Sequence, residues 1–242
     1  MSLWESFWDK LLGKKVVTER KTVEQSSKSD NNELVRKEDK SNKDIEEWNI
    51  EFNLANLGKK SGMNQESLTH FNKSLKLIDI ALKKEPKNIV LWSVKGVALS
   101  ELGKYNEAKD CFDETIEMDP RNFSGWNNKG MVLSKQGKYQ EAIDCLDKAL
   151  EIDMGIAEPW SWKGDALYRL GRHQEAIDCF RTAIQISPKD AAPWERKGMV
   201  EIKLGKYQEA ITSLERSNDL NMLDSRHRKQ VENIILKLRD RI

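Results

Sequence analysis

WSVKGVALSELGKYNEAKDCF, residues 92–112, is the stretch that decides the fold, because its key residues return three more times at a spacing of 34. The opening tryptophan and two glycines recur in every copy. They are Trp92, Trp126, Trp160 and Trp194; Gly96, Gly130, Gly164 and Gly198; and Gly103, Gly137, Gly171 and Gly205. A fixed period held over four copies indicates a repeat protein.

Each copy predicts two helices joined by a short turn. The first runs over about residues 92–102, and the glycine after it supplies a left-handed cap. The second begins near the Lys-Tyr pair and ends before Pro120. Within it, Ala108, Phe112 and Ile116 are spaced by four residues, which indicates one buried helix face.

The glycine inside the first helix needs a physical reason, because glycine there costs about 1 kcal/mol relative to alanine. We expect the paired helix to approach Gly96 closely, near Ala108. We expect Trp92 to fill the space between successive hairpins, since one hairpin cannot bury its apolar face alone. The stem of Lys95 is expected to cover the core while its ammonium stays in water.

In its spacing the chain resembles the tetratricopeptide repeat family, whose pattern W-x3-G-x6-G-x-Y-x2-A-x3-F-x7-P fits the first unit. Departures are mild: His173 replaces the tyrosine of the third unit, and Met154 and Met222 replace two prolines. The resemblance implies an all-α fold, a right-handed superhelical solenoid of antiparallel helix pairs. It also implies that the protein binds other proteins.

The spacing divides the chain into segments. A divergent unit is expected over 44–88, with a first helix over Asp44–Leu57 anchored by Trp48, and a capping helix over 225–242. The full units between them are expected at 89–122, 123–156, 157–190 and 191–224.

The N-terminal 43 residues differ from the repeats. Residues 1–13 predict an amphipathic helix, and residues 14–43 a flexible polar linker with a reach of about 30 Å. The apolar positions of this helix are Trp4, Phe7, Trp8, Leu11 and Leu12. Such a helix is marginal alone in water. It can lie on a membrane surface, dock on a partner protein, dock in the chain's own groove, or do little.

Composition and motifs argue against several classes of function. The net charge is +1, whereas a nucleic-acid-binding protein would show a basic excess. Three cysteines recur at one repeat position, too far apart for a disulfide or a shared metal ion, and the three histidines are scattered. Motifs of catalysis and of phosphate binding are missing from the sequence. We therefore expect no enzyme activity, no cofactor, no metal site and no nucleic-acid partner.

The sequence also bears on location. No stretch approaches the roughly 20 apolar residues of a membrane-spanning helix, and no cleavable signal is recognised. A cytoplasmic protein is expected, with weak contact to a membrane surface through residues 1–13 as an alternative.

In the family that the chain resembles, the first helices of successive repeats line a concave groove that binds a peptide or helix. Carried over by position, the partner-binding candidates are Asn127, Met131, Ser134, Ser161, Asp165, Tyr168, Arg169, Glu195, Met199 and Lys203. Ser93, Val97, Asp165 and Glu195 stand where some members carry the Lys/Asn/Arg clamp for chaperone C-termini, so that ligand is not expected. Two hypotheses remain: a scaffold that binds a partner segment in this groove, and a peripheral membrane adaptor anchored by residues 1–13.

Overall fold

The computed structural model describes residues 47–56, 64–220 and 225–242. Within these ranges the regular structure is helical and contains no strand. This agrees with the predicted all-α solenoid. The predicted helix over residues 1–13 and the predicted linker over 14–43 lie outside the described residues.

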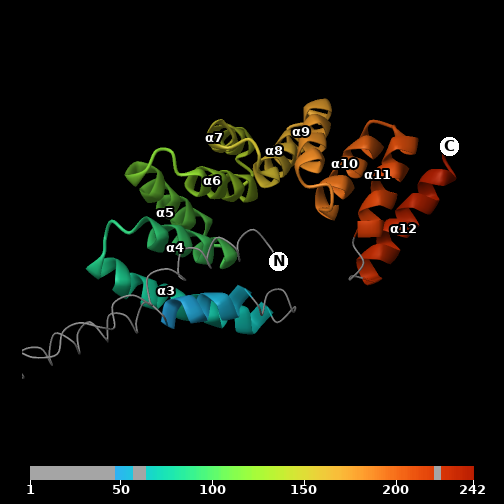
Figure 1. The fold of residues 1–242 in the computed structure, drawn as a ribbon. Helices are drawn as coiled ribbons and strands as arrows, with labels where there is room; N and C mark the ends of the chain where they lie inside the picture. The colour runs from blue at the N-terminus through green and yellow to red at the C-terminus, as the bar shows by residue number, and fades with distance from the viewer. Residues whose placement is uncertain (1–46, 57–63, 221–224) are drawn as a thin grey trace, which may run out of the picture. The chain divides into compact units, whose positions relative to one another are not determined.

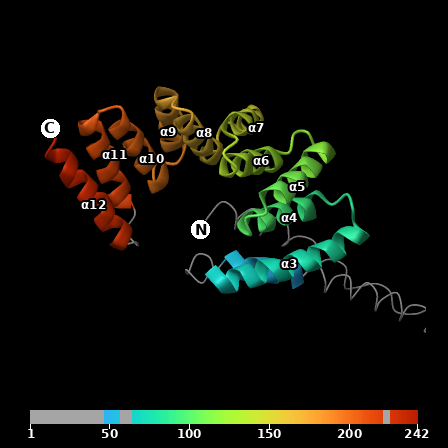
Figure 2. The same cartoon turned by 180° about the vertical axis from the view of Figure 1, so that it is seen from behind.

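The described helices follow one another as antiparallel neighbours (Figure 1). A helix over residues 47–56 comes first, then α3 (Asn64–Lys84), and α12 (Ser225–Arg239) comes last. Between them are four pairs: α4 (Ile89–Glu101) with α5 (Tyr105–Met118), α6 (Phe123–Lys135) with α7 (Tyr139–Ile152), α8 (Ala157–Arg169) with α9 (His173–Ile186), and α10 (Ala191–Lys203) with α11 (Tyr207–Leu220). Each second helix also packs against the first helix of the next pair, as the reverse view shows (Figure 2).

The turn within each pair has the geometry that the glycine predicted. Gly103 has φ of 75°, and its N–H donates to the carbonyl of Ser100. The N–H of Lys104 reaches back to the carbonyl of Leu99 at 2.9 Å. These two bonds satisfy the last carbonyls of α4 in a Schellman motif. The same bonds recur in the other three pairs.

The glycine inside each first helix faces a large side chain of the second helix. A Cβ on Gly96 would lie 2.6 Å from Cε1 of Phe112. We expected the close contact near Ala108 and its equivalents. In the first pair the nearest atoms belong to Phe112, one turn further along α5, while in the second pair the carbonyl of Ala142, the equivalent of Ala108, would also lie 3.1 Å from a Cβ on Gly130. In the second pair the neighbour of Gly130 is Leu146, whose Cγ would lie 2.7 Å from the added Cβ. The glycine therefore makes room for a fully buried phenyl or leucyl group.

Each tryptophan of the repeat links its unit to the preceding one. The indole N–H of Trp92 donates to the carbonyl of Pro86 at 2.8 Å, and the three later tryptophans make the same bond six residues back. The ammonium of Lys95 lies 5.2 Å from the centre of this indole and 2.7 Å from Asp79 of α3. The ammonium is thus paired with a carboxylate, a partner that the sequence prediction did not include. We call this set of contacts the unit junction.

The unit junction recurs with one exception. Lys129 pairs with Asp113, and Lys163 pairs with Asp147, each at 2.5 Å. At the next junction Arg181 occupies the position of the aspartate.

Lys197 therefore pairs within its own unit. It lies 2.7 Å from Glu201 and donates to Ser213 at 2.8 Å, and Ser213 donates to Glu201 at 2.7 Å. Glu201 is buried at 2% exposure, where the three earlier units have leucine. The hydroxyl of Ser213 stands where those units have cysteine. The fourth unit thus holds a closed polar network in place of apolar contacts.

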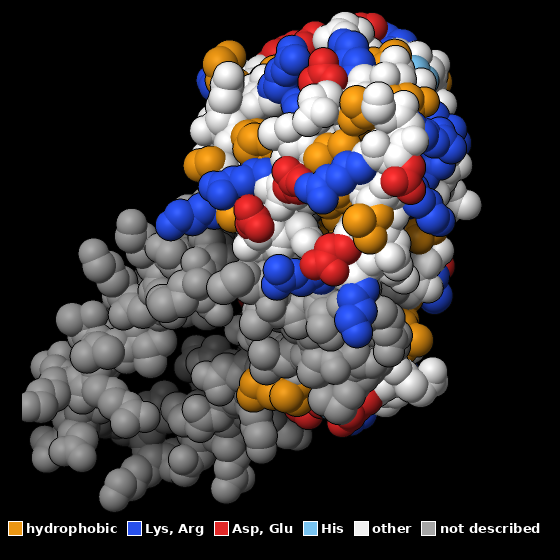
Figure 3. Space-filling model, turned by 90° about the vertical axis from the view of Figure 1, so that its right-hand side faces the viewer, with side chains coloured by type: hydrophobic (Ala, Val, Ile, Leu, Met, Phe, Trp, Pro, Cys, Tyr) orange, Lys and Arg blue, Asp and Glu red, His pale blue; other side chains and the backbone are white. Residues whose placement is uncertain are grey.

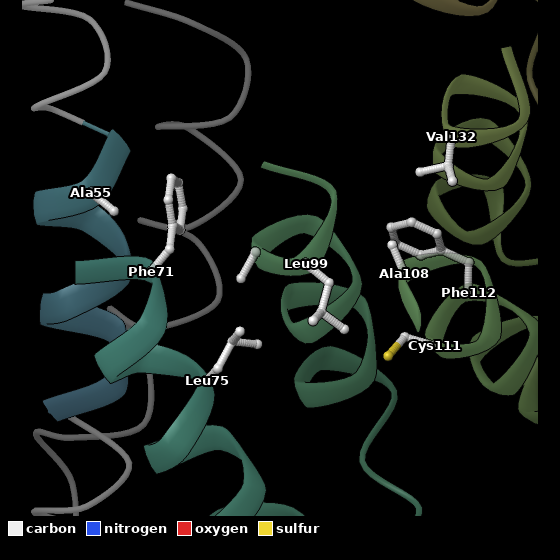
Figure 4. Close-up of a cluster of buried hydrophobic side chains, with 9 residues drawn as sticks. Ala55, Phe71, Leu75, Leu99, Ala108, Cys111, Phe112 and Val132 are labelled. Carbon is white, nitrogen blue, oxygen red and sulfur yellow. The ribbon is translucent and has the colours of Figure 1, made fainter. Parts of the chain in front are cut away.

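The apolar core is shared between pairs. One cluster joins Ala55, Phe71, Leu99, Phe112 and Val132, which come from five successive helices (Figure 4). The three cysteines are free and buried, so they serve as small packing residues.

One helix lies at each end of the described array. Trp48 of the helix 47–56 is buried against α3 and α4, in a cluster with Ile78 and Leu91. At the other end, α12 buries Val231, Ile235 and Leu238 in a cluster with α11. Among the described helices, none has the length and apolar character needed to cross a membrane.

Candidate partner-binding face

The first helices of the four pairs form one layer. α4 contacts α6, α6 contacts α8, and α8 contacts α10, in addition to the contacts within each pair. In the described array, direct contacts between successive second helices are less extensive than these. We call the surface of α4, α6, α8 and α10 that faces away from the second helices the inner face.

A pocket of about 580 Å³ opens on the inner face between α6, α8 and α10. Six of the ten residues proposed from the sequence line it: Ser134, Asp165, Tyr168, Arg169, Glu195 and Met199. The remaining lining residues are Lys135, Tyr139, Trp162, Phe180, Ala192, Arg196 and Val200. The structure therefore brings most of the proposed residues of the second, third and fourth units together.

The other four proposed residues lie outside this lining. Asn127 and Ser161 are buried, at 3% and 7% exposure. Met131 packs against the core that α4 and α5 share. Lys203 is exposed at the end of α10.

Sequence reasoning missed two of the charged and aromatic side chains that line the pocket, Trp162 and Arg196. Nη1 of Arg196 lies 3.0 Å from Oδ2 of Asp165, and its guanidinium lies 5.6 Å from the centre of the Trp162 ring. Trp162 and Arg196 occupy the same repeat position, where the first two units have Val94 and Asn128. This departure from the repeat was the available signal.

Burial and charge act in opposite directions on Asp165. Burial raises the pKa of this carboxyl to about 6, although the charges of Arg196 and Arg169 favour its ionised form. The two cationic neighbours therefore offset only part of the free-energy cost of burying the ionised carboxyl.

The pocket combines flat apolar surfaces with charges. Trp162, Tyr168 and Met199 supply apolar area, and Tyr168 lies against the ring of His173 at a centroid distance of 5.4 Å. Lysine and arginine side chains in the lining outnumber the acidic ones by three to two. Aromatic and arginine side chains of this kind are enriched at the centres of protein interfaces. Across the described ranges, no group of His, Cys, Asp and Glu is arranged to hold a metal ion.

Comparison with known families agrees with the repeat. Models of the tetratricopeptide repeat match residues 123–153, 157–190 and 191–221. A model of the protein prenyltransferase alpha subunit repeat matches residues 105–136, which comprise the second helix of one unit and the first helix of the next. A search of curated proteins finds no match.

Several solved structures share the fold. TTC0263, a thermophilic TPR protein from Thermus thermophilus, is 16% identical with a TM-score of 0.62, over 78% of this chain and 99% of that one. MamA (41-end) from Desulfovibrio magneticus RS-1 is 18% identical with a TM-score of 0.59, over 74% and 97% of the two chains. YrrB, described as a TPR protein with an unusual peptide-binding site, is 21% identical with a TM-score of 0.55, over 76% and 90%.

The 34-residue period, the paired helices with their glycine caps and the three matched units lead to one conclusion. The chain belongs to the tetratricopeptide repeat family.

Proposed function

We propose that this protein is a non-catalytic interaction scaffold that binds a segment of a partner protein in the inner-face pocket between α6, α8 and α10. The observation that carries the proposal is the pocket itself, about 580 Å³ in volume and lined by side chains of three successive units. A groove of this kind suits an extended peptide or a helix, which would be anchored by a few side chains.

Two features of the lining support peptide binding. Trp162 and Tyr168 offer large contact areas with few rotatable bonds, and Met199, which is 42% exposed, adapts to different shapes. Arg196 is held over Trp162 by its contact with Asp165, so its guanidinium is already oriented. Side chains that are ordered before binding lose less entropy when a ligand arrives.

A random peptide library tests the proposal without requiring that the partner be identified first. The full chain would be immobilised and panned with phage-displayed random peptides, and the affinities of the selected peptides would be measured by fluorescence anisotropy. Met199→Lys should weaken these peptides about tenfold or more, because it places a charge in the apolar part of the pocket.

The matched control is Met154→Lys. Met154 is 70% exposed in the turn between α7 and α8 and does not line the pocket. Selected peptides that bind both variants equally well would place the binding surface elsewhere, and failure to select any peptide would argue against peptide recognition.

The second candidate is a peripheral membrane adaptor. It depends on the pattern of Trp4, Phe7, Trp8, Leu11 and Leu12, which lie outside the described residues. Liposome flotation of the full chain and of a chain lacking residues 1–13 tests it. Flotation that does not change on deletion would refute the adaptor.

A further inference from the structure

The two helices that close the described array carry opposite charge. Residues 44–56, which include the first described helix, contain four acidic residues and no Lys or Arg. Residues 225–242, which include α12, contain six Lys or Arg and two acidic residues. The whole chain has a net charge of only +1, so the charge is strongly separated between these two segments.

The first helix presents an apolar and acidic surface. Trp48 and Ala55 are buried against α3 and α4. On the opposite side, Ile50 is 57% and Leu54 is 42% exposed, with the exposed Glu47 three residues before Ile50. These three residues follow the i, i+3, i+7 spacing of one helix face. We call Glu47, Ile50 and Leu54 the acidic end.

α12 presents an apolar and basic surface. Its core side packs against α11, while Leu236 is 55% exposed and Lys229, Lys237, Glu232 and Asp240 are exposed. Glu232 pairs with Arg228 of the same helix at 3.3 Å, and the segment keeps a net positive charge. We call Lys229, Leu236 and Lys237 the basic end. Figure 3 is turned to the side on which α12 lies and shows Lys and Arg groups interleaved with Asp, Glu and apolar ones.

The two ends occupy equivalent places in the repeat. The helix 47–56 packs with α3 as a first helix does, and its other side is where a preceding unit would pack. α12 follows α11 as the first helix of a next unit would. In a solenoid, such faces are buried by stacking a neighbour against them.

We propose that the basic end of one copy of this chain binds the acidic end of a second copy, so that copies associate head to tail. The exposed Leu and Ile side chains supply apolar area, and Lys229 and Lys237 face Glu47 across the contact. A contact between two different surfaces of the same chain is heterologous, so it extends into a ring or an open filament.

The salt dependence follows from the charges. Attraction between exposed charges falls with ionic strength, since the Debye length shrinks from about 30 Å at 0.01 M to about 8 Å at 0.15 M. Association of the full chain should therefore be strongest at low salt and should increase with protein concentration.

Sedimentation velocity of the full chain over a concentration series provides the test. Lys229→Glu/Lys237→Glu should abolish the rise in sedimentation coefficient, because it places like charges at the contact. Glu47→Lys should raise the dissociation constant, by about tenfold. The matched control Lys138→Glu/Lys189→Glu changes two exposed lysines elsewhere in the array and should associate like the wild type.

Mixing distinguishes this interface from others. In a mixture of Glu47→Lys with Lys229→Glu/Lys237→Glu, the unchanged basic end of one variant meets the unchanged acidic end of the other, so association should return. Three results would overturn the proposal: a wild type that stays monomeric at low salt, association as strong in the reversed variants as in the wild type, or a mixture that associates no better than its components. A wild type that stays monomeric is also the result expected if another segment of the same chain covers one of the two ends, and that result counts against the proposal as well.

Discussion

Converting the fourth unit to the arrangement of the first three should stabilise the protein, whereas replacing its buried glutamate alone should destabilise it. The polar network of Lys197, Glu201 and Ser213 replaces the leucine and the cysteine of the earlier units, and Arg181 replaces the aspartate that pairs with the lysine. The full conversion is Arg181→Asp/Glu201→Leu/Ser213→Cys.

The magnitudes follow from burial. Glu201→Leu alone leaves the ammonium of Lys197, whose side chain is 13% exposed, without the carboxylate at 2.7 Å. Breaking a buried pair in this way costs about 3–5 kcal/mol. A buried leucine regains about 1.5–3 kcal/mol. The single variant should therefore be about 1–3 kcal/mol less stable than the wild type.

The triple variant gives Lys197 a new partner. Asp at position 181 would pair with it as Asp147 pairs with Lys163, while Leu and Cys fill the core. Replacing a buried ion pair by well-packed apolar groups often stabilises by about 1–4 kcal/mol. Arg181→Asp alone should change stability by less than about 0.5 kcal/mol, because Arg181 is exposed.

Urea denaturation of the full chain at pH 7, followed by circular dichroism, measures these differences. The predicted order of stability is triple variant, wild type, Glu201→Leu. If Glu201→Leu is as stable as the triple variant, Lys197 needs no carboxylate in the folded protein, and the reasoning from the unit junction fails.

Three further predictions follow from the structure. Gly96→Ala should lower the free energy of unfolding by about 1–2 kcal/mol, because the new Cβ would press on the fully buried Phe112. Gly155→Ala, in an exposed turn, serves as the control, and a higher free energy of unfolding for Gly96→Ala would contradict the packing argument. Burial raises the pKa of Asp165 from its ordinary 3.8 to about 6, so the stability that its protonated form contributes is full below about pH 4 and is lost as the pH rises through 6. The free energy of unfolding of Asp165→Asn should therefore rise by about 1–3 kcal/mol relative to that of the wild type between pH 4 and pH 7, and a difference that does not depend on pH would refute this. Burial also raises the pKa of Cys111 to about 12 and the pKa values of the other two thiols to about 11. A disulfide reagent at pH 8 should therefore label the three thiols slowly in the folded protein and rapidly in urea, and fast labelling without urea would contradict their burial.

The fold could be predicted from the sequence because the residues that determine it act locally and recur at a fixed spacing. The tryptophan and glycine positions repeat at 34 residues, and each turn glycine has the positive φ that its cap requires. The pattern placed the close approach near Ala108 and its equivalents, and the carbonyls of Ala142 and Ala210 do lie close to the glycines of their pairs. The nearest side chains, such as Phe112 at Gly96, come from one turn further along, because the pattern does not show the axial offset of the two helices.

The candidate site was harder to predict because it depends on departures from the repeat. A position carried over by family resemblance identifies a helix face, and it led to Asp165 and Tyr168. Arg196 and Trp162 were missed because their repeat position is buried in the first two units, where small residues occupy it. The buried Glu201 was missed for the same reason, and the concurrent change at Arg181 was the signal that pointed to it.

The unit junction also bears on how such a chain can lengthen during evolution. The second unit carries both halves of the junction, Lys129 toward the unit before it and Asp147 toward the unit after it. A tandem duplication of residues 123–156 in the gene would therefore create a new boundary at which lysine again meets aspartate. Duplicating the third unit would set Arg181 against a second copy of Lys163, and two cations would face each other. The array is thus free to grow at its middle and resists growth at the boundary before the fourth unit.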